Sequence, residues 1–133
     1  MRLVIDESVC TGCRCCELAC PARHEGEFAP ARARVQIRSS REQHGAFIDV
    51  CTQCAEGSCI EACPVDAIAR DPADGVVKID YELCTQCMEC VDACPNNAMF
   101  VDIETGSPIK CDLCGGDPEC VKFCRPQALT LWV

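Results

Sequence analysis

Cysteine is the residue type best placed to do chemistry in this chain, because it supplies seventeen of the 133 residues. Sixteen of these cysteines form four repeats with one order of spacing. In each repeat, two residues separate the first two cysteines, two to five residues separate the second from the third, and three residues separate the third from the fourth. A proline directly follows the fourth cysteine in three of the repeats. The members, in chain order, are Cys10, Cys13, Cys16 and Cys20; Cys51, Cys54, Cys59 and Cys63; Cys84, Cys87, Cys90 and Cys94; and Cys111, Cys114, Cys120 and Cys124.

The spacing within each repeat predicts ligands for iron and sulfide. The first three cysteines wrap a tight loop whose sulfur atoms converge on one face, which matches three iron corners of a cubane [4Fe–4S] cluster. The fourth cysteine points away along a helical turn, and in two-cluster bacterial ferredoxins it binds the other cluster. The repeats are therefore expected to work in pairs. Four repeats predict four [4Fe–4S] clusters, with all sixteen cysteines as iron ligands and no catalytic residue.

Three other uses of cysteine fit these repeats less well. Structural zinc favours two Cys-x2-Cys pairs roughly a dozen or more residues apart, whereas the later cysteines here follow within a few residues. A redox-active Cys-x2-Cys motif would not recur in every repeat. The odd count and tight clustering also argue against the disulfide scaffold of a secreted protein. Metal-bound thiolates in a reducing compartment are the better interpretation.

Cys15 is the cysteine that the repeats leave over. If Cys15 replaced Cys16 as a ligand, the first repeat would lose the spacing of the third. Cys16 is therefore the expected ligand, and Cys15 is expected to be a small packed thiol. His24 and His44 lack partners at ligand spacing and are expected to be surface or loop residues. Gly12 either lets the backbone approach sulfide or serves as an ordinary turn glycine.

Short strands and turns are expected to position the repeats. Extended segments are predicted at residues 3–6, 47–50 and 129–133. Hairpins are predicted around Asp74-Gly75 and around Thr105-Gly106-Ser107. The residues between the third and fourth cysteines of each repeat suit one helical turn, which the proline behind it would stop.

Composition limits both the core and the partners. The formal net charge is −9, from 12 Lys and Arg against 21 Asp and Glu, so neither nucleic acid nor an anionic membrane is an expected partner. We recognise no secretion signal and no long apolar run, and expect a cytoplasmic protein. Aromatic residues make up only 5% of the chain, so the clusters are expected to hold the fold together. No nucleophile, general base or Gly-rich phosphate loop is recognisable, which indicates an electron carrier that is not an enzyme by itself.

With these motifs, the chain resembles the four-cluster iron–sulfur subunits of molybdenum and tungsten oxidoreductases. These include the subunits of dimethyl sulfoxide reductase and formate dehydrogenases, and the polyferredoxin subunits of aldehyde oxidoreductase-type tungsten enzymes. The resemblance spans almost the whole chain, and the longer gaps before Cys59 and Cys120 are features of that family. It implies an α+β, doubled bacterial-ferredoxin fold, with short antiparallel hairpins and short helices around four cubane clusters.

The resemblance also implies that one ferredoxin-like unit is nested inside another. The first and fourth repeats would pair in an outer unit, residues 1–45 plus 104–133, which strands near the two termini would close. The second and third repeats would pair in an inner unit, residues 46–103. The implied ligand sets are Cys10, Cys13, Cys16 with Cys124; Cys111, Cys114, Cys120 with Cys20; Cys51, Cys54, Cys59 with Cys94; and Cys84, Cys87, Cys90 with Cys63.

The implied partner is a larger catalytic subunit, a tungsten or molybdenum enzyme and most specifically one of aldehyde oxidoreductase type. The alternatives are a hydrogenase, a formate or carbon monoxide dehydrogenase, or a free polyferredoxin shuttle. Self-stacking of such small subunits into a longer wire is a further expectation. The cysteine-free stretch 21–50 is either a solvated loop with one strand over 34–38 or a docking surface for the partner. It holds five of the twelve cationic residues, at Arg23, Arg32, Arg34, Arg38 and Arg41.

Overall fold

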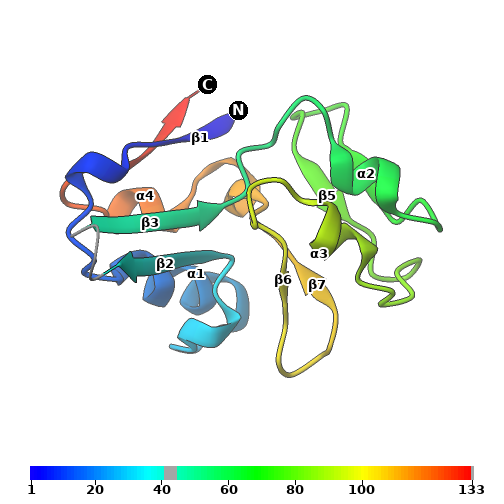
Figure 1. Ribbon diagram of the computed structural model, residues 1–133, viewed down its shortest axis with the longest axis horizontal. Coiled ribbons are helices and arrows are strands. Elements are labelled where there is room, and N and C mark those ends of the chain that lie inside the picture. The colour runs from blue at the N-terminus through cyan, green and yellow to red at the C-terminus, as the bar shows by residue number, and fades with distance from the viewer. Residues whose placement is uncertain (41–44, 133) are drawn as a thin grey trace.

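Residues 1–40 and 45–132 are described by the computed structural model, and their secondary-structure elements are short (Figure 1). The strands in these residues form four two-stranded antiparallel sheets. The pairs are β1 (Arg2–Ile5) with β8 (Leu129–Trp132), β2 (Val35–Ser40) with β3 (Gly45–Val50), β4 (Ile68–Arg70) with β5 (Val77–Ile79), and β6 (Phe100–Val101) with β7 (Pro108–Ile109). The predicted α+β fold with short antiparallel hairpins is confirmed.

The two predicted hairpin turns lie where the sequence places them. Gly75 and Gly106 both adopt left-handed backbone conformations, with φ of +75° and +72°. Only glycine reaches this region without a steric penalty from a Cβ atom. In the first turn, the side chain of Asp74 also accepts a hydrogen bond from the Val76 N–H at 2.9 Å. Through these turns the backbone reverses direction between β4 and β5 and between β6 and β7.

Each α-helix carries at least one cysteine of a repeat. The helices are α1 (Cys15–Glu25), α2 (Ser58–Ala62), α3 (Glu89–Ala93) and α4 (Glu119–Phe123). Short 3₁₀ turns also occur at Glu7–Val9, Pro30–Arg32 and Leu113–Gly116. As predicted, α2, α3 and α4 are single turns that end at the fourth cysteine of their repeats.

The prediction that Pro21 stops the first helix is wrong. Helix α1 continues through Pro21 for another turn and ends at Gly26, whose φ is +72° and whose N–H donates to Ala22 O at 3.2 Å. A proline removes one donor from the helix. The second turn still forms because Pro21 is buried and the left-handed Gly26 caps the helix end.

Helix packing places the repeats in two pairs (Figure 1). Helix α1 packs against α4, and α2 packs against α3. Strands β1 and β8 lie side by side, so the two ends of the chain meet on the α1–α4 side. The predicted pairing of the terminal strands is confirmed for the described residues; Val133 lies outside them. Strand β3 begins at Gly45, the expected end of the outer segment, and all of it pairs with β2 of that segment.

The buried apolar residues form two small clusters that include cysteines. The larger one contains Leu3, Val35, Ile48, Leu113 and Leu129, together with four buried cysteines. The smaller one consists of Ile68, Val77, Cys90 and Met99. In both clusters, aliphatic side chains therefore pack together with cysteines of the repeats. Among the described residues, no helix is long and apolar enough to cross a membrane.

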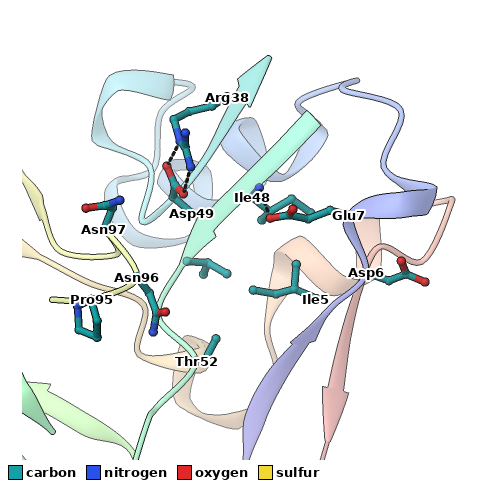
Figure 2. Close-up of a pocket in the computed structure, with 11 residues that line it drawn as sticks. Ile5, Asp6, Glu7, Arg38, Ile48, Asp49, Thr52, Pro95, Asn96 and Asn97 are labelled. Atoms are coloured by element: carbon teal, nitrogen blue, oxygen red, sulfur yellow. Dashed lines mark hydrogen bonds and ion pairs between the residues drawn. The ribbon is translucent and has the colours of Figure 1, made fainter. Parts of the chain in front are cut away.

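Three arginines of the stretch 21–50 make ion pairs within the protein, two of them with residues outside the stretch and one inside it. They pair as Arg32 with Asp102, Arg34 with Asp112, and Arg38 with Asp49. The last pair joins β2 to β3 at the wall of a hollow (Figure 2). Glu7 and Ile48 line the same hollow, and the Glu7 carboxylate accepts the Ile48 N–H at 3.1 Å. Arg23 is exposed, and Arg41 lies outside the described residues. The predicted strand over 34–38 is confirmed as β2, and these three guanidinium groups link segments of the fold.

Candidate iron–sulfur sites

The four cysteine loops share one backbone feature. The residue before the second cysteine has a positive φ in every repeat: Gly12 at +72°, Gln53 at +55°, Gln86 at +62° and Leu113 at +58°. For the three residues with side chains, this conformation costs on the order of 1–2 kcal/mol each. Such strain persists where the surrounding structure imposes it, and it concentrates at functional sites. The four loops therefore share this local turn, and Gly12 occupies the position that the turn makes costly for other residues.

Three small hollows are each lined by four cysteines of the repeats. One has Cys10, Cys13, Cys16 and Cys124 on its walls. The second has Cys51, Cys54, Cys59 and Cys94. The third has Cys84, Cys87, Cys90 and Cys63. In each case three cysteines of one repeat meet the fourth cysteine of another repeat. Four thiolates converging on one space form the donor set that a [4Fe–4S] cluster takes.

The remaining four cysteines also gather between α1 and α4. Burial raises the pKa of the Cys120 thiol, and the neighbouring thiols of Cys111, Cys20 and Cys114 raise it further. Cys20 reaches this group because it lies on the buried face of α1, which packs against α4. The fourth group thus combines the first three cysteines of the last repeat with the fourth cysteine of the first.

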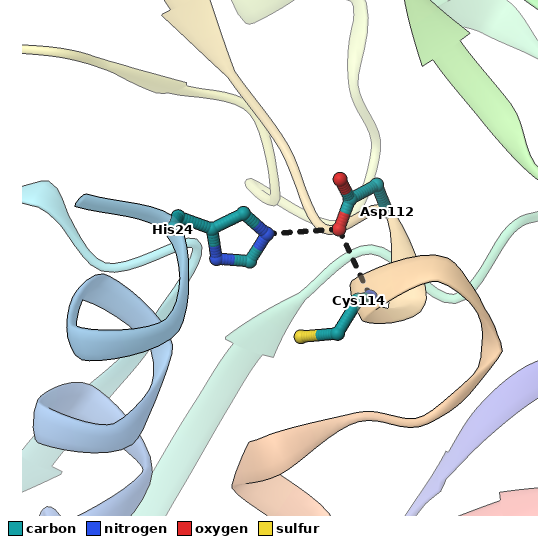
Figure 3. A group of neighbouring side chains, drawn as sticks. All are labelled: His24, Asp112 and Cys114. Atoms are coloured by element: carbon teal, nitrogen blue, oxygen red, sulfur yellow. Dashed lines mark hydrogen bonds and ion pairs between the residues drawn. The ribbon is translucent and has the colours of Figure 1, made fainter. Parts of the chain in front are cut away.

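His24 stands beside this group and is not the surface residue that was expected. Its side chain is only 13% exposed. Its Nδ1 lies 2.9 Å from Cys20 O and 3.7 Å from Cys20 Sγ. Its Nε2 lies 2.9 Å from Asp112 Oδ1 (Figure 3). The same carboxylate oxygen accepts the Cys114 N–H at 3.0 Å. The Asp112 hydrogen bond raises the pKa of His24. His44 lies outside the described residues.

His24 also belongs to a group of three residues whose types could bind a single metal ion. Ligand atoms of His24, Asp112 and Cys114 lie within 4.8 Å of one another. However, both His24 nitrogens face oxygen acceptors, so both carry hydrogen and neither offers a lone pair to a metal. We interpret His24 and Asp112 as the hydrogen-bonded surroundings of the fourth cysteine group. The one-turn offset of His24 from Cys20 on the same helix face is the sequence signal that could have suggested this place.

Backbone N–H groups point at several of the sulfur atoms. The fourth cysteines of the first three repeats accept such bonds: Arg34 N donates to Cys20 Sγ at 3.3 Å, Ala67 N to Cys63 Sγ at 3.2 Å, and Ala98 N to Cys94 Sγ at 3.4 Å. Gln53 N and Leu113 N donate to the first cysteines of their own repeats. Hydrogen bonds to ligand sulfur stabilise negative charge on it and are one of the factors that set cluster potentials.

Burial makes the thiols of these groups poor acids. It raises the pKa of Cys16 and of Cys111 to about 12, and that of Cys90 to about 11. Metal ligation requires the thiolate form, and the charge of a bound metal supplies the compensation that the apolar surroundings lack. Buried thiols clustered in this way fit a cationic metal–sulfur group better than they fit free thiols.

Cys15 is exposed, so the expectation of a packed thiol is wrong. It begins α1, and with Leu18, Phe28 and Phe123 it lines an apolar hollow. Cys15 also lies on the wall of the hollow that Cys10, Cys13, Cys16 and Cys124 share. Cys16, in contrast, is buried at 8% exposure among the core residues. One residue of helix rotation, about 100°, separates the two directions. The burial of Cys16 agrees with its choice as the ligand.

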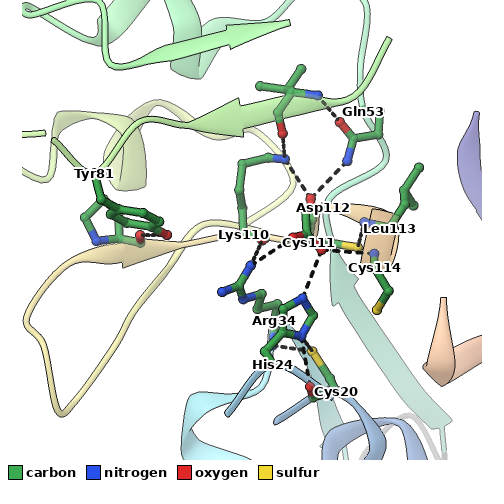
Figure 4. Close-up of polar contacts among 12 residues, drawn as sticks. Cys20, His24, Arg34, Gln53, Tyr81, Lys110, Cys111, Asp112, Leu113 and Cys114 are labelled. Atoms are coloured by element: carbon green, nitrogen blue, oxygen red, sulfur yellow. Dashed lines mark hydrogen bonds and ion pairs between the residues drawn. The ribbon is translucent and has the colours of Figure 1, made fainter. Parts of the chain in front are cut away.

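Sequence reasoning missed a buried polar network between the second and fourth repeats. Lys110 is 3% exposed, and its Nζ donates to Val77 O at 2.5 Å and to Cys111 O at 2.7 Å. Gln53 joins the same two residues: its Nε2 donates to Cys111 O at 3.0 Å, and its Oε1 accepts the Val77 N–H at 2.8 Å (Figure 4). The only sequence signal was a lysine inside the apolar segment that precedes Cys111.

Comparison with protein families places these loops in a known group. Two family models described as 4Fe–4S dicluster domains match the sequence, one over residues 43–133 and the other over residues 2–64. This protein belongs to the 4Fe–4S dicluster family. The two matches overlap at the second repeat and together include all four repeats. Membership in this family confirms the resemblance drawn from the cysteine spacing, and this 4Fe–4S dicluster protein is an iron–sulfur electron-transfer protein.

Relatives of this dicluster protein are named as parts of oxidoreductases. The polyferredoxin-like subunit of aliphatic sulfonate oxidoreductase from Pyrococcus furiosus is 36% identical over 124 residues, with 92% of this chain and 70% of that protein covered. The B component of polysulfide reductase from Wolinella succinogenes is 30% identical over 141 residues, with 96% and 73% covered. A solved structure of the active site complex BamBC of benzoyl coenzyme A reductase with benzoyl-CoA matches with a TM-score of 0.57 and 30% identity, covering 96% of this chain and 76% of that chain.

Proposed function

We propose that this dicluster protein carries four [4Fe–4S] clusters on its sixteen repeat cysteines. The observation that carries the proposal is the shared loop conformation, because the residue before the second cysteine is left-handed in all four repeats. A loop that had lost its cluster would have no reason to keep the strained backbone of the other three. A bound [4Fe–4S] cluster supplies a one-electron redox couple.

The ligand sets that we propose cross between repeats. The three hollows and the fourth group of thiols support the sets implied by the resemblance, in which each fourth cysteine joins a different repeat. We also propose the nested division into an outer unit, residues 1–45 plus 104–133, and an inner unit, residues 46–103. The packing of α1 on α4 and of α2 on α3 supports this pairing of repeats.

Anaerobic reconstitution with iron and sulfide tests the number of clusters. The proposal requires about sixteen iron atoms per chain, four for each cluster. Acid-labile sulfide should match the iron, and the reduced protein should give an electron paramagnetic resonance spectrum of coupled clusters. About eight iron atoms per fully folded chain would reduce the assignment to two clusters.

We further propose that the protein relays single electrons to or from a larger catalytic subunit in a stable oxidoreductase complex. The named relatives support this partner class, since they are components of reductases and oxidoreductases. A tungsten- or molybdenum-dependent enzyme of aldehyde oxidoreductase type is the partner that we favour. The alternatives are a hydrogenase, a formate or carbon monoxide dehydrogenase, or a free polyferredoxin shuttle.

Purification from the native source at moderate salt tests the partnership. We expect a complex much heavier than the 14.5 kDa chain, with tungsten or molybdenum in the larger subunit. A companion subunit that lacks both metals would favour the hydrogenase-type alternative. A monomeric protein with its clusters intact and no companion would favour the free shuttle.

A further inference from the structure

Lys110 is a buried cation without a carboxylate partner among the described residues. Its side chain lies in the interior at 3% exposure, and none of the ion pairs in residues 1–40 and 45–132 includes it. Both hydrogen bonds that its Nζ donates go to backbone carbonyl groups, those of Val77 and Cys111. Burying an ammonium group with only neutral acceptors is costly. A negative charge close by would offset that cost.

The surroundings of Lys110 identify where that negative charge arises. Lys110 lines the hollow of Cys51, Cys54, Cys59 and Cys94, and its ammonium bonds to the carbonyl of Cys111 in the fourth group. The positive charge therefore lies within electrostatic reach of both cysteine groups.

Reduction adds one negative charge to a cluster, and the interior screens that charge far less than water does. A cation fixed beside the cluster stabilises the reduced form more than the oxidised form. Net charge and burial around an iron–sulfur cluster are among the factors that set its potential. Gln53 holds the ammonium in place, because its amide bridges the same two residues, Val77 and Cys111, whose carbonyl groups the lysine contacts.

We propose that the positive charge of Lys110 tunes two of the four clusters. It raises the reduction potentials of the clusters bound by the Cys51 group and the Cys111 group above those of the other two clusters. This inference rests on the proposed ligand sets. One of these two clusters belongs to each proposed unit. An electron that enters at the cluster of the Cys10 group or of the Cys84 group would therefore move toward the clusters beside Lys110. No bond forms or breaks, and the electron comes from the neighbouring cluster or from the catalytic partner.

Redox titration of the reconstituted protein, followed by electron paramagnetic resonance, tests this role. Lys110→Gln removes the charge but keeps an amide donor. Lys110→Arg keeps the charge, and Lys78→Gln removes one positive charge from an exposed lysine of β5. We expect Lys110→Gln to lower the potentials of two clusters and leave the other two near their original values. At a fixed potential, the reduced-to-oxidised ratio should fall about tenfold, which equals about 59 mV for a one-electron couple. Lys110→Arg and Lys78→Gln should leave all four potentials almost unchanged.

Gln53→Glu provides a second route that keeps the lysine. Gln53 and Lys110 contact the same two residues, so a carboxylate at position 53 would place a negative charge near the ammonium. The same two potentials should fall, and iron content is measured on the same samples. Unchanged potentials in both neutralising variants at full iron content would overturn the proposal. An equal fall of the potentials in Lys78→Gln would also overturn it. Loss of iron from both neutralising variants, with full iron content in Lys110→Arg, would show that Lys110 has a structural role alone. Wild-type iron content reports separately on the cluster assignment itself.

Discussion

At the scale of single residues, the feature that matters most is the position of the fourth cysteine in each repeat. Cys20 follows Cys16 by four residues, yet it lies with Cys111, Cys114 and Cys120 near the other end of the chain. A helical turn separates the two sulfur atoms and points them toward different groups. One helix can therefore supply ligands to two sites, which keeps those sites close together for electron transfer.

Cys20→Ser should damage the site of the last repeat and spare the site of its own repeat. We expect iron to fall by about a quarter, from about sixteen to about twelve atoms per chain, since one of four four-iron clusters loses a ligand. Iron analysis and the spectrum of the reduced protein measure this loss. Damage confined to the cluster of Cys10, Cys13 and Cys16 would contradict the crossed ligation.

Cys15→Ser is the matched control, because Cys15 adjoins the first repeat but is exposed and begins α1. Replacing an exposed thiol with a hydroxyl should leave the iron content at about sixteen atoms per chain. The variant should also react with one fewer equivalent of a thiol reagent when the clusters are intact. A fall in iron comparable with that of Cys20→Ser would make Cys15 a ligand in place of Cys16.

At the scale of elements, one ion pair connects the 3₁₀ turn that follows α1 with the β6–β7 hairpin. Arg32 Nε and Nη2 donate to the two carboxylate oxygens of Asp102, each at 2.9 Å. Both side chains are at least 90% buried. The Arg32 hydrogen bond lowers the pKa of Asp102 to about 2, so the pair is ionised at neutral pH. The elements are too short to hold their relative positions through backbone pairing alone, and this contact supplies part of the connection.

Asp102→Asn should destabilise the protein, because it removes the carboxylate that accepts two hydrogen bonds from Arg32 and leaves only Glu25 and Glu27, each at 3.2 Å, to balance the guanidinium charge. The faster loss of clusters on heating, followed by absorbance under anaerobic conditions, measures the effect. Asp71→Asn is the control, since Asp71 pairs with Lys78 at the surface, where such pairs contribute about 0–1 kcal/mol. Equal rates of cluster loss in the two variants would show that the buried pair has no special weight.

At the scale of the whole molecule, cysteine groups occupy the centres where a larger protein would have aliphatic cores. The two apolar clusters are small and pack around the cysteine loops. In such sites the free energy of metal binding is largely folding free energy. The short strands also form only two-stranded sheets, which have little stability on their own.

Removing iron should therefore unfold most of the protein. Treatment with an iron chelator in air should abolish the near-ultraviolet signal of fixed aromatic side chains and most of the backbone signal in circular dichroism. Reconstitution with iron and sulfide under anaerobic conditions should restore both signals, which separates unfolding from irreversible oxidation. A cooperative unfolding transition in the iron-free protein would show instead that the apolar clusters are sufficient.

The sequence by itself determined the number of cysteine repeats, the iron–sulfur chemistry and the hairpin turns, because cysteine spacing and glycine at left-handed positions are local properties. The meeting of the terminal strands also followed from the resemblance, and β1 and β8 pair as expected. Such features need no knowledge of how distant segments pack.

Only the tertiary structure decided the surroundings of the sites. His24 is buried because α1 packs beside Asp112, and Cys15 is exposed because the helix turns it away from the core. Helix α1 passes through Pro21 because the packing of its buried face and the cap at Gly26 outweigh the donor that proline removes. The Lys110 side chain donates to Val77 O, 33 residues away in sequence, and lines the hollow of the Cys51 group. The burial and charge of a residue depend on such distant neighbours, and for that reason local spacing cannot specify them.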